Sequence, residues 1–370
     1  MKIVFLVAEQ NKPHEGVARP FLNLASGMRG TEMAWVALFR CGPKIINHVN
    51  ELDISSCVLN SKSELVKEIE DRQPDFVICD DTFLNLGMLS SFKKKARANI
   101  VVYVQVLYGV HAISGCFDLS YLAIKEKTIF SLSRFIPFSF LIRKYNKVLN
   151  NCDTVIANSN ATASILQTFY GVNVHGVVYP PIDTEVFKPI GRTINPRDIM
   201  LYLGSHAGDT QVNLATGIVD KIQNENYTIN LFGSKKLAMF LKEKCSKLNY
   251  YTDIEDKQLA SLYSQSLLTV CPQRWETFGY VPVESMTCGT PSLVFNTMGL
   301  QETVGLNKVG WAVNSDEEFL STLDSILKYE CRFPSSNALR KYAMNNFSIK
   351  ASVNQLLRLL TSRLKRQQKS

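Results

Sequence analysis

The chain has 370 residues, 46% of them hydrophobic, and a formal net charge of +8 at pH 7. This length and composition predict a globular protein of about two domains and exclude repeat and low-complexity architectures. Its apolar runs are too short to cross a bilayer, and its nine cysteines show no C-x-x-C pairing, so neither a membrane span nor a zinc site is expected.

The first part of the chain alternates strands with helices. Residues 1–8 and 33–39 are predicted as buried strands, and 17–28 as a helix with apolar side chains at helical spacing. The polar turn before this helix ends at Gly16, which either brings the backbone close to a ligand or serves only as a turn residue. A strand, a glycine turn and a helix are the first unit of a doubly wound, Rossmann-like sheet.

Two more strands follow in the same half. The first ends in Asp80 and Asp81, and the second is the continuous apolar run 100–106, which suits a sheet covered on both faces. Ligand-facing residues of open α/β sheets collect at the carboxyl ends of the strands. The two aspartates are therefore expected at a ligand-facing edge.

Residues 117–149 form a long basic and aromatic segment, which Pro137 divides. Its phenylalanines lie between lysines and arginines, which is typical of an amphipathic segment in a membrane interface. A pair of helices packed on the first domain has the same pattern. Both interpretations stay open at this point.

The second half begins after a polar, proline-bounded linker at 190–196. A strand at 198–204 ends at Gly204, and the polar loop after it contains His206. Three further strands and three amphipathic helices are predicted, at 227–232, 250–253, 267–271, 320–328, 337–346 and 347–369.

The stretch from Cys271 to Val304 organises this second half. Glu276 and Glu284 are separated by seven residues, with Gly279 between them, and 280–287 is predicted as a helix. The N–H groups at the start of a helix lack intrahelical partners and face the positive end of its dipole, so this start suits a phosphate.

This stretch resembles the C-terminal signature of the retaining GT-B glycosyltransferases of family 4, the glycosyl transferases group 1. Ser285 and Thr287 stand where the family has alanines, and Met298 where it has a glycine. The positions in register are Glu276, Phe278, Gly279, Glu284, Met286, Gly289, Pro291, Gly299 and Glu302.

The resemblance implies an α/β fold of the GT-B type, with two Rossmann-like, doubly wound domains that face a cleft. Residues 1–189 would form the acceptor domain and 190–346 the nucleotide-sugar donor domain. The last helix, within 347–370, would cross back to the acceptor domain.

The resemblance also implies roles for residues of the donor site. Glu276 is expected to contact the sugar hydroxyls as a catalytic residue, and Glu284 the ribose hydroxyls. The remaining donor-binding residues are expected to be Gly16, Gly204, Thr252 and the amide-bearing run Phe278, Gly279, Tyr280 and Val281.

The chain departs from the family at three positions where the family has basic residues. The loop after 198–204 lacks the usual arginine and lysine, for which Arg274, or else His206, is the expected substitute. Gln105 stands where a histidine usually closes the strand 100–106, so either His111, as a catalytic residue in the following loop, or Gln105 itself is expected to serve.

The predicted function is retaining, metal-independent transfer of a hexosyl group from a UDP- or GDP-sugar to a glycan, glycoprotein or lipid-linked acceptor. No metal is expected because no D-x-D motif is present, and no cofactor or nucleic-acid partner is expected. The expected location is the cytoplasm, with the segment 117–149 leaving open a peripheral contact to the inner face of the membrane. The basic clusters at 93–97 and 363–369 fit a solvated basic surface, an anionic membrane or phosphorylated substrates. The alternatives are a catalytically weakened subunit that binds a nucleotide sugar or a partner enzyme, and a hydrolase or epimerase of nucleotide sugars.

Overall fold

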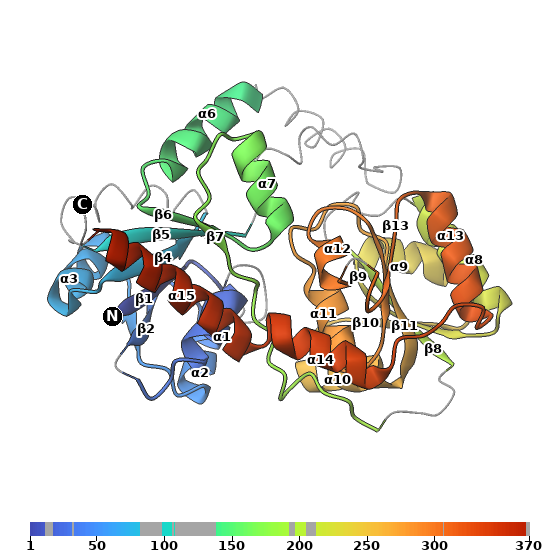
Figure 1. The fold of residues 1–370 in the computed structure, drawn as a ribbon. Helices are drawn as coiled ribbons and strands as arrows, with labels where there is room; N and C mark the ends of the chain where they lie inside the picture. Colours follow the sequence, from blue (N-terminus) through green and yellow to red (C-terminus); the bar gives the residue numbers. More distant parts are fainter. Residues whose placement is uncertain are drawn as a thin grey trace. The chain divides into compact units, whose positions relative to one another are not determined.

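The computed structural model describes residues 1–11, 18–31, 33–81, 98–105, 107, 138–191, 197–204, 212–305 and 307–367. The chain divides into two compact domains (Figure 1). The first contains Met1–Tyr108, Ser139–Pro181 and Ile349–Ser370, and the main segment of the second is Ile182–Ser348.

The first domain is a seven-stranded sheet in the order β3-β2-β1-β4-β5-β6-β7, with every pair parallel. Its central strands are continuous apolar runs because helices cover both faces of the sheet (Figure 1). The strands are β1 (Ile3–Ala8), β2 (Ala34–Phe39), β3 (Ser56–Leu59), β4 (Phe76–Asp80), β5 (Asn99–Val104), β6 (Thr154–Ala157) and β7 (Gly176–Val177). The helices are α1 (Ala18–Ser26), α2 (Pro43–Glu51), α3 (Lys62–Arg72), α6 (Phe138–Leu149), α7 (Asn160–Thr168) and α15 (Ile349–Gln367).

The last helix, α15, returns to the first domain, as predicted. It packs on α1 so closely that a Cβ atom at Gly27 would lie 2.5 Å from Cγ2 of Ile349. Val353, Leu356 and Leu360 are buried in the same hydrophobic core as the strands. The guanidinium of Arg363 donates to the backbone oxygen of Asp153 at 2.8 Å, just before β6.

The described part of the basic and aromatic segment is α6. Tyr145 and Leu149 of this helix are buried, which agrees with a helix packed on the first domain. Residues 117–137 and the basic cluster 93–97 lie outside the described residues.

The second domain is a six-stranded parallel sheet in the order β10-β9-β8-β11-β12-β13, with its own hydrophobic core. Its strands are β8 (Asp198–Leu203), β9 (Thr228–Gly233), β10 (Leu248–Tyr251), β11 (Ser266–Cys271), β12 (Ser292–Phe295) and β13 (Trp311–Val313). Its helices are α8 (Val212–Asn224), α9 (Lys235–Lys242), α10 (Asp256–Gln265), α11 (Tyr280–Thr287), α12 (Leu300–Thr303), α13 (Asp316–Leu327) and α14 (Ser336–Phe347).

One predicted helix begins earlier than expected. The helix expected at 320–328 starts at Asp316, because the Ser315 side chain accepts a hydrogen bond from the backbone N–H of Glu318. A serine cap followed by three acidic residues is a standard helix start, since it satisfies an N–H group and suits the positive end of the helix dipole.

Both sheets have a point where the order of the strands reverses. In the first domain it lies between β1 and β4, and in the second between β8 and β11. The loops that leave these neighbouring strands diverge, so open α/β sheets bind their ligands outside the carboxyl ends of such a pair. The organising stretch begins with the loop that leaves β11.

Candidate functional site

The predicted helix at 280–287 is α11, and it begins directly after Gly279. This glycine has φ 100°, and a Cβ atom there would lie 2.8 Å from Cδ2 of Leu300. The left-handed backbone conformation is therefore what requires glycine here. No side chain caps the helix among the described residues, and its first turn carries no acid. This helix start has the N–H groups and dipole end that suit an anion.

Gly299 brings a second loop against the first. Its N–H donates to the backbone oxygen of Glu276 at 3.1 Å, and a Cβ atom on it would lie only 2.2 Å from the backbone oxygen of Thr277. The residue before it, Met298, has φ 49°, a left-handed conformation that favours glycine. This explains why a glycine suits position 298.

Glu284 lies on α11 and is only 3% exposed. Its Oε2 accepts a hydrogen bond from the hydroxyl of Tyr263 on α10 at 3.1 Å. A buried charge of this kind requires polar partners, because desolvating a carboxylate is costly. The structure thus places the predicted ribose-binding carboxylate inside the second domain, beside the carboxyl end of β11.

Glu276 lies in the loop that precedes α11 and is half-buried. Its Cγ lies 3.6 Å from the position that a Cβ atom of residue 279 would occupy. The side chain therefore lies beside the glycine at the helix start. The two predicted carboxylates flank the same short run of backbone.

Arg274, two residues before Glu276, is held by contacts with α13 and β12. Its Nη2 binds Oδ1 of Asp316 at the start of α13, and the guanidinium carbon lies 4.2 Å from the centre of the Phe295 ring. The side chain is 25% exposed. To contact a diphosphate, the guanidinium would have to share its hydrogen bonds with Asp316.

The other predicted donor-site residues lie at strand ends or outside the described chain. Gly204 is buried directly after β8, and Thr252 is exposed directly after β10. Gly16, His206 and His111 lie outside the described residues.

Two supports of the site were not expected from the sequence. The buried side chain of Gln273 donates through Nε2 to the backbone oxygen of Tyr202, which connects the β11 loop to the end of β8. Gly233 ends β9 with φ 112°, and a Cβ atom there would overlap the backbone oxygen of Leu203. The sequence did offer a signal for Gly233, because it is a glycine that ends an apolar strand, whereas nothing in the sequence marked Gln273.

Two cysteines border the site. Cys271 ends β11 and Cys288 follows α11, and both are buried. Burial, followed by the neighbouring carboxylates, raises the pKa of the Cys271 thiol well above its usual value, and burial raises that of Cys288 too. Both thiols therefore stay protonated, and a thiolate nucleophile is not available from this pair.

A buried polar cluster lies at the carboxyl ends of β4 and β5 in the first domain. Oδ1 of Asp81 accepts from the backbone N–H of Gln105 at 3.0 Å, and Oδ2 accepts from the Tyr145 hydroxyl at 2.5 Å. The side chain of Asn158 donates to the backbone oxygen of Gln105 at 3.3 Å. Burial raises the pKa of Asp81 to about 7. Gln105, one of the two acceptor-side candidates, is thus fixed through its backbone.

Neither a metal cluster nor a membrane-spanning helix is found in the described parts of the chain. Within those ranges no three acidic, histidine or cysteine side chains are grouped so that they could hold an ion. Likewise, none of the described helices combines the length and the apolar character needed to cross a bilayer.

Two family models match the chain, one for each domain. The model for Glycosyl transferases group 1 matches residues 184–346, and that for Glycosyltransferase Family 4 matches residues 20–186.

Three individual proteins illustrate the similarity. The chain is 26% identical over 156 residues to an uncharacterized 41.2 kDa protein in the cps region of Klebsiella pneumoniae, which covers 40% of this chain and 44% of the relative. It is 28% identical over 195 residues to a D-inositol 3-phosphate glycosyltransferase of Nocardiopsis dassonvillei, which covers 44% of each. The chain therefore spans about half the length of these curated relatives. The crystal structure of Anabaena Alr3699/HepE in complex with UDP shares the fold, with a TM-score of 0.73, 18% identity and coverage of 98% of this chain and 100% of that one.

Proposed function

The chain belongs to the glycosyl transferases group 1 family and has its GT-B fold of two Rossmann-like domains, and from this premise we propose that it moves a sugar from a nucleotide-diphosphate sugar to a glycan, glycoprotein or lipid-linked acceptor. The observation that carries the proposal is the start of α11. It combines a helix start that no side chain caps, a required glycine and two flanking carboxylates at the point where the strand order of the second domain reverses.

The protein's contribution to the reaction is electrostatic. Negative charge grows on the leaving diphosphate as the glycosidic bond breaks, and oriented N–H groups stabilise that charge without reorganising. In this scheme the amides from Phe278 to Val281 face the diphosphate, Glu284 binds the ribose and Glu276 holds the sugar hydroxyls.

The proposed stereochemical outcome is retention, by attack from the face that the leaving group occupies. This route needs no protein carboxylate as a covalent nucleophile, and the leaving phosphate assists the incoming hydroxyl. Metal-independent transfer is proposed with it, since the sequence lacks a D-x-D motif and the described residues contain no cluster of metal-binding side chains.

The donor is proposed to be a uridine nucleotide sugar. The related Anabaena structure was solved with UDP, which supports uridine over guanosine. In this proposal Thr252, which is exposed directly after β10, contacts the base.

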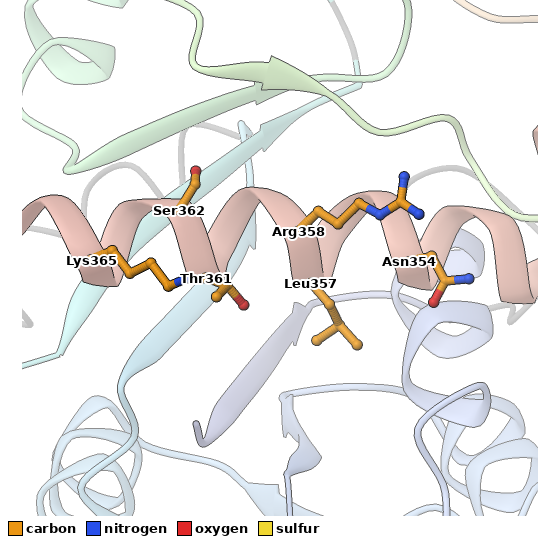
Figure 2. Close-up of a pocket in the computed structure, with 6 residues that line it drawn as sticks. All are labelled: Asn354, Leu357, Arg358, Thr361, Ser362 and Lys365. Atoms are coloured by element: carbon orange, nitrogen blue, oxygen red, sulfur yellow. The ribbon is translucent and has the colours of Figure 1, made fainter.

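Peripheral contact with an anionic membrane is proposed for a lipid-linked acceptor. The sequence of α15 contains five lysines and arginines and no acid. Arg358 and Lys365 line one groove of about 400 Å³ along this helix, together with Asn354, Leu357, Thr361 and Ser362 (Figure 2).

The membrane proposal is tested by sedimentation with anionic phosphatidylglycerol vesicles and neutral phosphatidylcholine vesicles. Each cation near an anionic surface contributes about 1 kcal/mol, so replacing Arg358 and Lys365 together by glutamine is expected to weaken anionic binding by about thirtyfold. Glutamine at two exposed lysines of the second domain, Lys308 and Lys341, is the control. Equal binding of both double variants would contradict a role for α15.

The donor proposal is tested by thermal unfolding with UDP-, GDP- and ADP-sugars. A ligand at a hundredfold excess over its Kd stabilises by about 2.7 kcal/mol, a shift of roughly 5–10 °C for a domain of this size. Glu284→Gln is expected to abolish the shift, whereas Glu330→Gln, at an exposed position of the same domain, should leave it intact. No shift with any nucleotide sugar at millimolar concentration would refute the proposal.

The pairing of Arg274 with Asp316 favours one second candidate, a subunit that binds the nucleotide sugar without transferring it. Charge-assisted hydrogen bonds to the diphosphate would then be few. Nucleotide binding without release of UDP, in the presence of a panel of acceptors, would support this candidate over the enzyme.

A further inference from the structure

Tyr263 on α10 is a fully buried tyrosine whose ring is fixed on two sides. The rings of Phe187 and Phe232 lie 6.4 Å and 6.2 Å from it, centre to centre, and its exposed fraction is 0%. Its backbone is held as well, because Oγ1 of Thr290 donates to its backbone oxygen at 2.7 Å. The ring contacts and the backbone hydrogen bond hold the Tyr263 side chain in place, and its hydroxyl contacts Glu284.

Packing alone does not explain the hydroxyl. Phenylalanine would fill the same space between the aromatic rings, and a buried hydroxyl without an acceptor is destabilising. The Tyr263 hydroxyl donates to Oε2 of Glu284 at 3.1 Å. Burial, and after it the Glu284 carboxylate, raises the pKa of this phenol well above its usual value. The phenol therefore remains a hydrogen-bond donor at every physiological pH.

We propose that Tyr263 is a positioning residue for Glu284, which fixes the plane of this carboxylate for the ribose hydroxyls of the donor. The inference rests on the proposed function, in which Glu284 binds the ribose. Two oxygens that accept from two neighbouring hydroxyls must be correctly oriented, and a rigid donor on one of them supplies that orientation. Tyr263 itself touches no ligand in this scheme.

The test compares two ligands that differ in one hydroxyl. UDP and 2′-deoxy-UDP are titrated by calorimetry into the full chain and into Tyr263→Phe. A hydrogen bond to a charged group corresponds to about a ten- to hundredfold preference for UDP in the unaltered protein. In Tyr263→Phe this ratio is expected to fall at least threefold, since a carboxylate that is not oriented distinguishes the two ligands less well.

Tyr227→Phe is the matched control. Tyr227 is 1% exposed, and its hydroxyl donates to the backbone oxygen of Leu327 at the same 3.1 Å. It precedes β9, at the amino end of a strand whose carboxyl end faces the site. The same atom is removed, at comparable burial, so the loss of stability should be similar. The ratio of the two affinities should not change.

The outcomes separate the inference from the function on which it rests. An unchanged ratio in Tyr263→Phe, with the protein folded, overturns the positioning role and leaves the donor site intact. No preference for UDP in the unaltered protein removes the proposed ribose contact, and the inference with it.

A second variant keeps the inference testable if Tyr263→Phe does not fold. Glu284→Gln should remove most of the preference for UDP while Tyr263 is retained. An unchanged preference for UDP in Glu284→Gln would overturn the positioning role, because Tyr263 would then have no ribose-binding carboxylate to orient.

Discussion

Gly299 is the residue whose replacement most directly separates the two loops of the candidate site. In Gly299→Ala the new Cβ atom would lie 2.2 Å from the backbone oxygen of Thr277 and 2.6 Å from Cα of Phe278. Both obstacles are backbone atoms, which cannot rotate away. Since φ at this position is −72°, alanine is not strained by its own conformation, and the effect is steric.

The size of the effect follows from the contacts that must be lost. Separating the loops by about 1 Å breaks the hydrogen bond from the Gly299 N–H to the Glu276 backbone oxygen, worth about 0.5–1.5 kcal/mol, and adds overpacking of about 1–3 kcal/mol. We expect a loss of about 2–4 kcal/mol of unfolding free energy. Because the same movement displaces Phe278 at the start of α11, nucleotide binding should weaken by at least tenfold.

The assay is urea unfolding together with a nucleotide titration, and Gly217→Ala is the control. Gly217 lies within α8, where a Cβ atom would lie 3.2 Å from Cδ1 of Leu320, the end of a flexible side chain. Alanine inside a helix is favoured over glycine by about 0.5–1 kcal/mol, so the control should be neutral or stabilising. If Gly299→Ala were as stable as the unaltered protein, the close contact of the two loops would be refuted.

Three further predictions concern single residues. Burial raises the folded-state pKa of Asp81 from 3.8 to about 7, so the folded protein binds an extra proton between these values and loses stability as the pH rises from about 4 to 7. Asp81→Asn should remove this dependence of the unfolding free energy on pH, measured by urea unfolding at pH 5 and 7. The same change in unfolding free energy between the two pH values in both proteins would contradict it. Ser315→Ala should cost about 1 kcal/mol through loss of the α13 cap, whereas Ser321→Ala, at an exposed position within the same helix, should have little effect on the thermal midpoint. Met298→Gly removes the strain of a left-handed backbone at a non-glycine residue and should raise the thermal midpoint, by an amount corresponding to less than about 1 kcal/mol. A lower midpoint would show that the methionine side chain stabilises the fold by more than its conformation costs.

The sequence predicted those features whose signal is local. The continuous apolar runs of β1 and β2, the helix after Gly279 and the final amphipathic helix were all expected, because each depends on a pattern within one short stretch. The family resemblance within 271–304 then led to the correct fold, since fixed spacing among many positions is specific.

The features that were missed depend on residues far apart in the chain. Arg274 binds Asp316, which is 42 positions later, and neither residue alone signals the pair. Tyr263 had the pattern of an ordinary core aromatic, because only the fold brings Glu284 to its hydroxyl. Asp81 was expected at a ligand-facing edge, whereas its contacts with Gln105 and Tyr145 required the positions of β5 and α6.

The return of α15 to the first domain has a consequence for biosynthesis. The core of that domain includes Leu356 and Leu360, which the ribosome adds only after it has made the whole segment Ile182–Ser348. The sheet and the hydrophobic core of the second domain lie within Ile182–Ser348 and can fold as soon as that segment emerges, whereas the first domain must wait with part of its apolar surface uncovered. A nascent chain of this protein therefore completes its domains in the reverse of the order in which it begins them, and a premature stop after Ser348 would damage the earlier-made domain and spare the later one.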